Sequence, residues 1–143
     1  MKIFISLAIL ILTFSSCQKA PGNFAKFPWK PYSKQAVEDS VARHKPVVID
    51  FWAEWCPNCH ELDRQVFSRP DIQAKLSQVT ALRMDVTNQD DPEVQKIIQE
   101  YSLIGVPTVV LLDSKGKEIK DARVEGFVTP QEFSQAFKLG HIE

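Results

Sequence analysis

The sequence is poor in cysteine, because its 143 residues include only Cys17, Cys56 and Cys59. Three cysteines are too few for a scaffold held together by disulfides. The net charge is −1, which argues against a nucleic-acid-binding protein, since such proteins are usually basic. The sequence contains no internal repeat and no low-complexity tract. With 44% hydrophobic and 24% charged residues, it has the composition of one globular domain.

The N-terminal apolar run, residues 3–14, is too short to span a bilayer comfortably, because a spanning helix needs about 20 residues. A lysine before this run and two serines after it give the layout of a secretory signal. Cys17 follows directly and resembles the cysteine of a bacterial lipobox, which becomes the lipidated first residue of the mature protein. We therefore expect residues 1–16 to be a signal peptide and Cys17 to carry a lipid. Ordinary cleavage and an uncleaved anchor are the alternatives.

These features predict a periplasmic protein that is anchored to a bacterial membrane. Gln18, directly after Cys17, resembles the signal that sorts lipoproteins to the outer membrane of Gram-negative bacteria. Disulfides persist in the periplasm, so a Cys-x-x-Cys pair in this compartment can cycle between its oxidised and reduced states.

Residues 17–32 are expected to be a tether, because they are rich in proline and lack helical or alternating periodicity. The aromatic residues Phe27, Trp29 and Tyr32 indicate that the last part of this tether packs onto the domain. From residue 33 to residue 143, helical patterns alternate with short β-branched runs, which predicts parallel strands joined by helices. Strands are expected at 47–52, 79–86, 106–113 and 117–125, the last two as a hairpin, and helices are expected to begin near 33, 57, 70, 92 and 130. The predicted fold is α/β, with a central four-stranded mixed sheet and helices on both faces.

The Cys-x-x-Cys pair lies where the first long strand passes into a helix. Pro57 suits the first helical turn, where its missing N–H costs little. Cys56 would then lie at the helix N-terminus, beside unpaired N–H donors and the positive end of the helix dipole. Both favour the thiolate, which is the nucleophilic form of cysteine. Cys59, nearly one turn later, can attack a mixed disulfide at Cys56 and release the product.

Two acids accompany the cysteines. Asp50 interrupts the apolar strand, and the period-2 alternation of a strand places it on the same face as Cys56, buried behind it. A buried carboxylate is costly to ionise, so Asp50 could exchange protons with the resolving thiol, Cys59. Alternatively, nearby polar groups simply satisfy it. Asp63 lies one turn beyond Cys59 and either faces the cysteines or is a solvated helix residue.

Three other interpretations of the cysteines compete with this chemistry. A zinc or copper site would need more ligands than one Cys-x-x-Cys supplies, and His44, His60 and His141 do not fall at a recognised metal spacing. A purely structural disulfide would close a loop too short to stabilise the chain much. A non-catalytic binding module would be expected to lose one of the cysteines or Pro107.

The stretch VVIDFWAEWCPNCHELD at 47–63 resembles the active-site segment of the thioredoxin family, and GVPT at 105–108 resembles its cis-proline loop. Residues 45–73, 84–91, 105–118 and 122–127 are similar, segment by segment, to the C-terminal domain of the thiol:disulfide interchange protein DsbD. The resemblance implies that Cys56 attacks, that Cys59 resolves, and that Pro107 is a cis-proline facing them. It also implies that Asp50 and Asp63 are the two acids flanking the cysteines.

The substrate-binding residues are expected to be Trp55, Pro57, Val106 and Pro107. The resemblance suggests that Trp55 shields the site, and the backbone of Val106 is free to pair with an extended substrate. The expected substrates are oxidised protein thiols. The dipeptide between the cysteines, Pro-Asn, differs from that of thioredoxin, and His60 replaces a lysine. Reduction is favoured, with oxidation or isomerisation as the alternative.

The membrane-embedded domain of DsbD has no counterpart in these 143 residues. We therefore expect a separate upstream electron donor, such as a membrane thiol reductase. No bound cofactor, metal or nucleic acid is expected.

Overall fold

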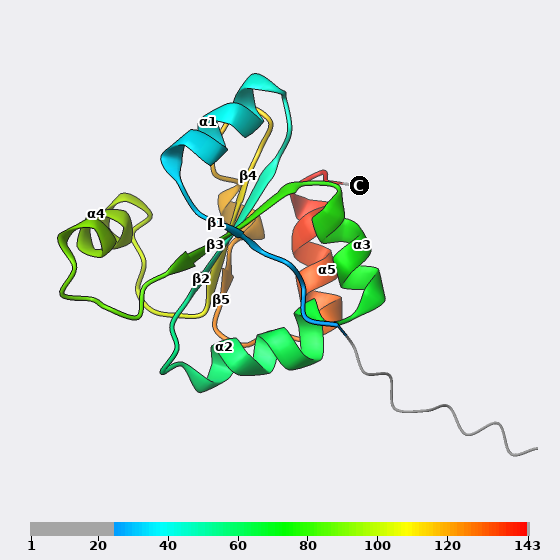
Figure 1. Cartoon of the computed structure of the whole chain (residues 1–143). Coiled ribbons are helices and arrows are strands. Elements are labelled where there is room, and N and C mark those ends of the chain that lie inside the picture. The colour runs from blue at the N-terminus through cyan, green and yellow to red at the C-terminus, as the bar shows by residue number, and fades with distance from the viewer. Residues whose placement is uncertain (1–24, 143) are drawn as a thin grey trace, which may run out of the picture.

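The computed structural model describes residues 25–142, so the predicted signal peptide, Cys17 and the first part of the predicted tether lie outside the described residues. Five strands form one mixed sheet in the order β1-β3-β2-β4-β5 (Figure 1). β1, β2 and β3 are parallel to one another, whereas β4 and β5 run antiparallel to their neighbours. The strands are β1 (Lys30–Pro31), β2 (Val47–Trp52), β3 (Thr80–Asp85), β4 (Thr108–Leu112) and β5 (Val124–Glu125).

β2 lies in the centre of the sheet, as its apolar sequence predicts. Val47 to Phe51 are all buried, because β2 is paired on both edges and covered on both faces. Its partners are β3, which pairs Val47 with Thr80 and Asp50 with Arg83, and β4, which pairs Ile49 with Val110.

Most helices begin at the capping residues that the sequence indicates. Ser33 and Asp91 accept hydrogen bonds from the first-turn N–H groups of their helices, and Thr129 forms a capping box with Glu132. After Cys56, the helix runs for six residues and then continues as a five-residue π-helical segment, η1. The helices are α1 (Lys34–Ala42), α2 (Pro57–Leu62), η1 (Asp63–Phe67), α3 (Pro70–Ser77), α4 (Pro92–Glu100) and α5 (Pro130–Leu139).

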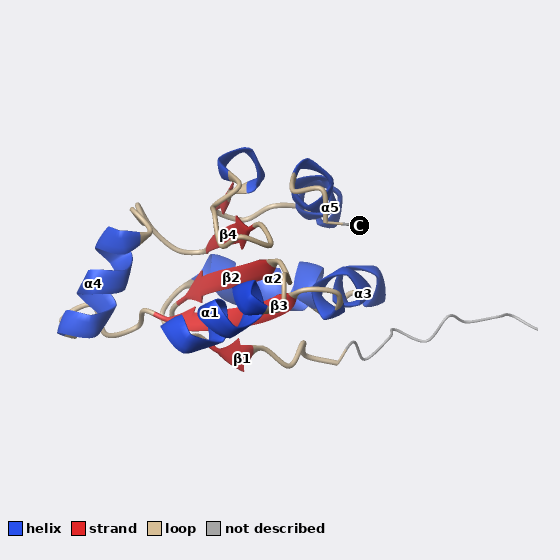
Figure 2. Ribbon diagram, turned by 90° about the horizontal axis from the view of Figure 1, so that it is seen from above, coloured by secondary structure: helices blue, strands red, loops and turns tan. Residues whose placement is uncertain are grey.

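Two hydrophobic clusters lie on opposite faces of the sheet. One joins Val48 of β2 to α2, η1, α3 and α5, and Phe67 and Phe133 are among its fully buried side chains. The other joins Ile49 and Phe51 of β2 to α1 and α4, and it includes both Cys56 and Cys59. Figure 2 shows the helices distributed over both sides of the sheet, which confirms the predicted α/β architecture. Among residues 25–142, none of the helices combines the length and apolarity needed to cross a bilayer.

The sheet has five strands where four were predicted, and the differences lie in its two edge strands, β1 and β5. The end of the predicted tether supplies an extra strand, β1, because Phe27 and Trp29 pack against the core and bring residues 30–31 beside β3. The predicted strand 117–125 is interrupted by a 3-10 turn, η2 (Lys120–Ala122), and only its last two residues pair as β5. Glu118 forms a single bridge to Leu112 before this turn.

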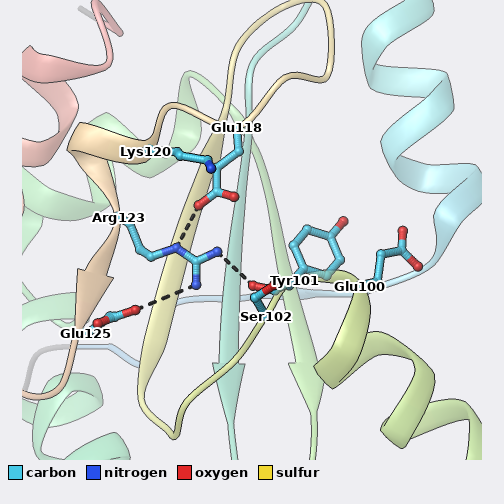
Figure 3. A pocket seen from close by; sticks show the side chains of 7 residues that line it. All are labelled: Glu100, Tyr101, Ser102, Glu118, Lys120, Arg123 and Glu125. Carbon is cyan, nitrogen blue, oxygen red and sulfur yellow. Dashed lines mark hydrogen bonds and ion pairs between the residues drawn. The ribbon is translucent and has the colours of Figure 1, made fainter.

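Arg123 explains why that strand is interrupted. Its guanidinium donates to the Tyr101 carbonyl at 2.8 Å and to Glu118 at 2.7 Å, and it lies 3.7 Å from Glu125 (Figure 3). These contacts tie the end of α4 to the segment before β5. Ala122, directly before Arg123, is buried in the core, which requires the chain to turn inward there. Among the charged residues that line the pocket drawn in Figure 3, Arg123 pairs with Glu118 and Glu125.

Candidate active site

Cys56 and Cys59 form a disulfide at the start of α2, with their Cα atoms 5.3 Å apart. Cys56 is the N-cap of the helix, and its sulfur accepts a hydrogen bond from the Cys59 N–H at 3.1 Å. The same N–H would stabilise a Cys56 thiolate in the reduced protein, because hydrogen bonds and the helix dipole favour the charged form. Both cysteines are largely buried, with exposed fractions of 3% and 4%. A partner must therefore approach the disulfide closely.

The turn between β2 and α2 is fixed by a neighbouring loop. Thr87 accepts hydrogen bonds from the Glu54 N–H at 2.8 Å and from the Trp55 indole N–H at 3.0 Å. The His60 ring lies 2.7 Å from the Glu54 carbonyl, and the Cys56 N–H donates to the Ala53 carbonyl.

The Trp55 side chain is held by the hydrogen bond at its indole nitrogen but remains 55% exposed. Nothing in the sequence pattern singled out Thr87, because its contacts are made across the loop after β3.

Asp50 and Asp63 meet on the guanidinium of Arg83, which the sequence interpretation missed. Arg83 Nε donates to Asp50 Oδ2 at 2.7 Å, and Arg83 Nη2 lies 2.6 Å from the same oxygen. Nη1 and Nη2 reach the two oxygens of Asp63 at 3.0 and 2.5 Å. Asp63 is therefore an internal ion-pair partner rather than a solvated helix residue. We call these three residues the Asp50–Arg83–Asp63 network.

A sequence signal for Arg83 did exist. It is the one basic residue within the three apolar strand segments 47–52, 79–86 and 106–113, and a buried acid needs such a partner.

The strand alternation expected to carry from Asp50 to Cys56 stops before it reaches the cysteine. β2 ends at Trp52, and a turn intervenes before Cys56. Within β2, Asp50 shares its face with Val48, which belongs to the cluster under α2, whereas Ile49 shares a cluster with the cysteines. Asp50 is buried, as predicted, with an exposed fraction of 1%.

Burial raises the pKa of Asp50 from 3.8 to about 6, although the charge and hydrogen bonds of Arg83 act in the opposite direction. The nearby Asp63 carboxylate adds to the rise. One guanidinium faces two carboxylates, so it cannot fully offset the cost of ionising the more buried one. For Arg83, burial lowers the pKa, but the two carboxylates outweigh this and leave its pKa raised. Arg83 is thus a permanent cation, and Asp50 is the group able to exchange a proton near neutral pH.

The loop before β4 contains a cis peptide bond between Val106 and Pro107, as the resemblance implied. Pro107 is buried, and its carbonyl accepts from the Gly126 N–H at 2.8 Å. Val106 packs against the cluster that contains both cysteines. The two cysteines and Val106 of the cis-proline loop thus share one hydrophobic cluster, although Pro57 and Val106 lie 49 positions apart in the sequence. Ile104, on the same loop, is 91% exposed.

Within residues 25–142, no group of three or more His, Cys, Asp or Glu side chains is arranged to hold a metal ion. Cys17, predicted to carry the lipid, lies outside the described residues.

A family model described as a thioredoxin-like domain matches residues 33–141. The thiol:disulfide interchange protein DsbD of Photorhabdus laumondii is 39% identical over 92 residues, which make up 64% of this chain and 16% of that protein. DsbD of Escherichia coli K12 is 36% identical over 112 residues, 78% of this chain and 19% of that protein. The chain thus spans less than a fifth of the length of these relatives.

The solved structure of the Neisseria meningitidis DsbD C-terminal domain in the oxidised form resembles this fold with a TM-score of 0.64. It is 31% identical in sequence, and the match covers 75% of this chain and 91% of that domain. The similarity therefore concerns the C-terminal part of DsbD.

Proposed function

This chain belongs to the thioredoxin-like domain family, and we propose that it reduces protein disulfides in the periplasm while a lipid on Cys17 holds it at a bacterial membrane. A Cys-x-x-Cys disulfide in such a domain is the mark of a thiol:disulfide oxidoreductase. The observation that carries the proposal is the Cys56–Cys59 disulfide at a helix start, with the Cys59 N–H bonded to the Cys56 sulfur.

In the reduced protein, the Cys56 thiolate attacks one sulfur of a substrate disulfide. A mixed disulfide forms, and the other substrate sulfur leaves as a thiolate that takes up a proton. Cys59 then loses its proton and attacks the Cys56 sulfur, which breaks the mixed disulfide and releases the second substrate thiolate. Two electrons have passed to the substrate, and the protein is left with the Cys56–Cys59 disulfide. An upstream dithiol donor must reduce this disulfide again by the same exchange in reverse.

Asp50 is proposed to accept the proton of Cys59. Its pKa of about 6 supports this, because a carboxylate with a pKa near the working pH exchanges protons efficiently. Asp63 is proposed to act through Arg83, which it holds in place with two hydrogen bonds. Val106, beside the cis-Pro107 bond, is proposed to pair with an extended substrate segment, and the exposed faces of Trp55 and Pro57 border the same site.

The reducing direction is supported by the similarity to DsbD and by the buried acid. Reduction potentials in this superfamily run from about −270 mV for reductants to about −120 mV for strong oxidants. We expect the Cys56–Cys59 pair to lie in the lower half of this range, between about −270 and −200 mV. Equilibration of the protein with glutathione or dithiothreitol buffers measures this value. A potential near about −120 mV would instead favour the alternative, a disulfide oxidase.

Substrate trapping tests the proposed chemistry in cells. In Cys59→Ser, the mixed disulfide at Cys56 cannot be resolved, so substrates should accumulate as adducts that a reductant releases. The double variant Cys56→Ser/Cys59→Ser is the matched control and should give no adducts. If Cys59→Ser captures nothing and the wild-type pair does not respond to redox buffers, the protein is a non-catalytic binding module. Metabolic labelling with a fatty acid, lost in Cys17→Ser, tests the lipid anchor separately.

A further inference from the structure

Residues 25–32 precede the matched family domain, which begins at residue 33, yet they dock on the strand that carries Arg83. Pro31 of β1 lies opposite Arg83 of β3, and the Tyr32 N–H donates to the Arg83 carbonyl at 2.9 Å. At the start of this segment, the Ala25 carbonyl accepts from the Gln73 side chain at 2.7 Å. Figure 1 shows this blue segment entering the sheet beside β3. The segment is therefore fixed at both of its ends.

Between these two ends, Trp29 lies over the Arg83 guanidinium. The guanidinium carbon is 5.0 Å from the centre of the Trp29 ring and 5.2 Å from that of Trp52, both within range of a cation–π interaction. The Trp29 ring is itself held edge-on by Phe27 and Phe67, each with its ring centre 5.0 Å away. Trp29 thus joins the N-terminal segment, the core and the Asp50–Arg83–Asp63 network.

The indole nitrogen of Trp29 is buried but finds no acceptor among the residues that the structure describes. Burying an N–H group without an acceptor opposes folding, so the hydrogen-bonding capacity of tryptophan does not explain its presence here. Trp29 instead supplies a large aromatic face that covers the guanidinium of Arg83, whose side chain is only 11% exposed.

We propose that Trp29 is a positioning residue of the redox site, which covers Arg83, keeps water from the Asp50–Arg83–Asp63 network and so sets how readily Asp50 exchanges a proton. This inference rests on the proposed function, because the network influences catalysis only if the cysteines react. Residues 25–32 then influence proton exchange at Asp50 and do not merely connect the domain to the residues before it.

The direction of the effect follows from the groups that face Asp50. Arg83 approaches it from β3, and Asp63 approaches the same guanidinium from η1. Burial has the largest influence on Asp50 and raises its pKa. Removal of the Trp29 ring admits water to the network, and water stabilises the carboxylate form. The proton affinity of Asp50 should therefore fall.

The test is the titration of the Asp50 carboxyl carbon by 13C NMR in the oxidised full chain, with Asp50→Asn used to assign the resonance. In Trp29→Ala, the Asp50 midpoint should move down by about one pH unit. In Trp29→Phe, which retains an aromatic cover over Arg83, the shift should be less than half as large. If Trp29→Ala does not fold, Trp29→Leu takes its place with the same expected direction. Phe137→Leu, a loss of packing on α5 in the same core cluster, should leave the midpoint unchanged.

An unchanged or raised Asp50 midpoint in the folded Trp29 variants would overturn the proposal, as would an equal shift in Phe137→Leu. The pH dependence of the reduction potential gives a second readout: its inflection should move with the NMR midpoint in Trp29→Ala. Trapping by Cys59→Ser is scored separately. If trapping fails and the wild-type pair does not respond to redox buffers while the NMR midpoint moves as expected, the proposed function is wrong, but the positioning of Asp50 by Trp29 stands.

Discussion

Replacement of Asp50 by asparagine should make the oxidised protein more stable at neutral pH. The substitution keeps the shape of the side chain but removes the group that ionises. Burial raises the pKa of Asp50 from 3.8 to about 6 despite its contact with Arg83, so the folded protein holds the Asp50 proton more tightly than the unfolded chain does. The folded state is therefore disfavoured once the pH is high enough to ionise this carboxyl group.

The size and sign of the effect follow from the linkage between proton binding and folding. Below pH 3.8, Asp50 is protonated in both states and costs nothing. As the pH rises from 3.8 to about 6, the unfolded chain has lost the proton and the folded protein has not, so the free energy of unfolding falls. A shift of about two units corresponds to about 3 kcal/mol, at 1.36 kcal/mol per unit. Above this window, the loss is complete.

Urea denaturation of the oxidised proteins at intervals from pH 4 to pH 8 measures this effect. We expect Asp50→Asn to match the wild type near pH 4 and to exceed it by up to about 3 kcal/mol at pH 7.5, with an unchanged dependence on urea. Asp90→Asn, which alters an exposed carboxylate beside α4, is the control and should follow the wild-type profile. If Asp50→Asn is less stable than the wild type at pH 7.5, the Arg83 ion pair outweighs burial and the reasoning fails.

Three further substitutions test what holds the fold together. Ser40→Ala removes a buried hydroxyl that lies 2.7 Å from Thr80 Oγ1. It should lower the free energy of unfolding, measured by chemical denaturation, by about 1–3 kcal/mol. A change near zero would mean that water replaces the lost hydrogen bond. Thr129→Ala breaks the capping box with Glu132 and should cost about 1 kcal/mol, visible as a lower Tm, whereas Thr129→Ser should restore it. Phe133→Ala empties a fully buried site between α5 and η1 and should cost about 3–5 kcal/mol; a loss below about 1 kcal/mol would show that the core collapses around the gap.

The parts of the fold that the sequence predicted well are those fixed by local chemistry. The apolar run 47–52 forms the buried central strand, and Asp91 and Thr129 cap their helices as their side chains favour. Cys56 lies at a helix start because Pro57 suits the first helical turn. Each of these features depends on neighbours only a few residues away.

The features that the sequence did not predict depend on distant partners. Arg83 meets Asp63 and Asp50 across 20 and 33 positions, so its place in an apolar strand marks it as unusual but does not identify its two partners. β1 contains a proline and only two residues, and it forms because the side chains before it pack on the core. The interruption of the strand 117–125 likewise depends on Arg123, whose guanidinium donates to a carbonyl at the end of α4.

The two outermost strands, β1 and β5, are each only two residues long. β1 ends in Pro31, which has no N–H to offer, and the chain leaves β5 through Gly126 in a left-handed conformation with φ of 77°. Edge strands this short expose few free backbone N–H and C=O groups, so an unfolded polypeptide has little to pair with at either edge of the sheet. For the proposed reductase, such short edge strands would keep extended substrate chains from adding to the sheet and would leave the loop that carries the cis bond as the place for them to pair.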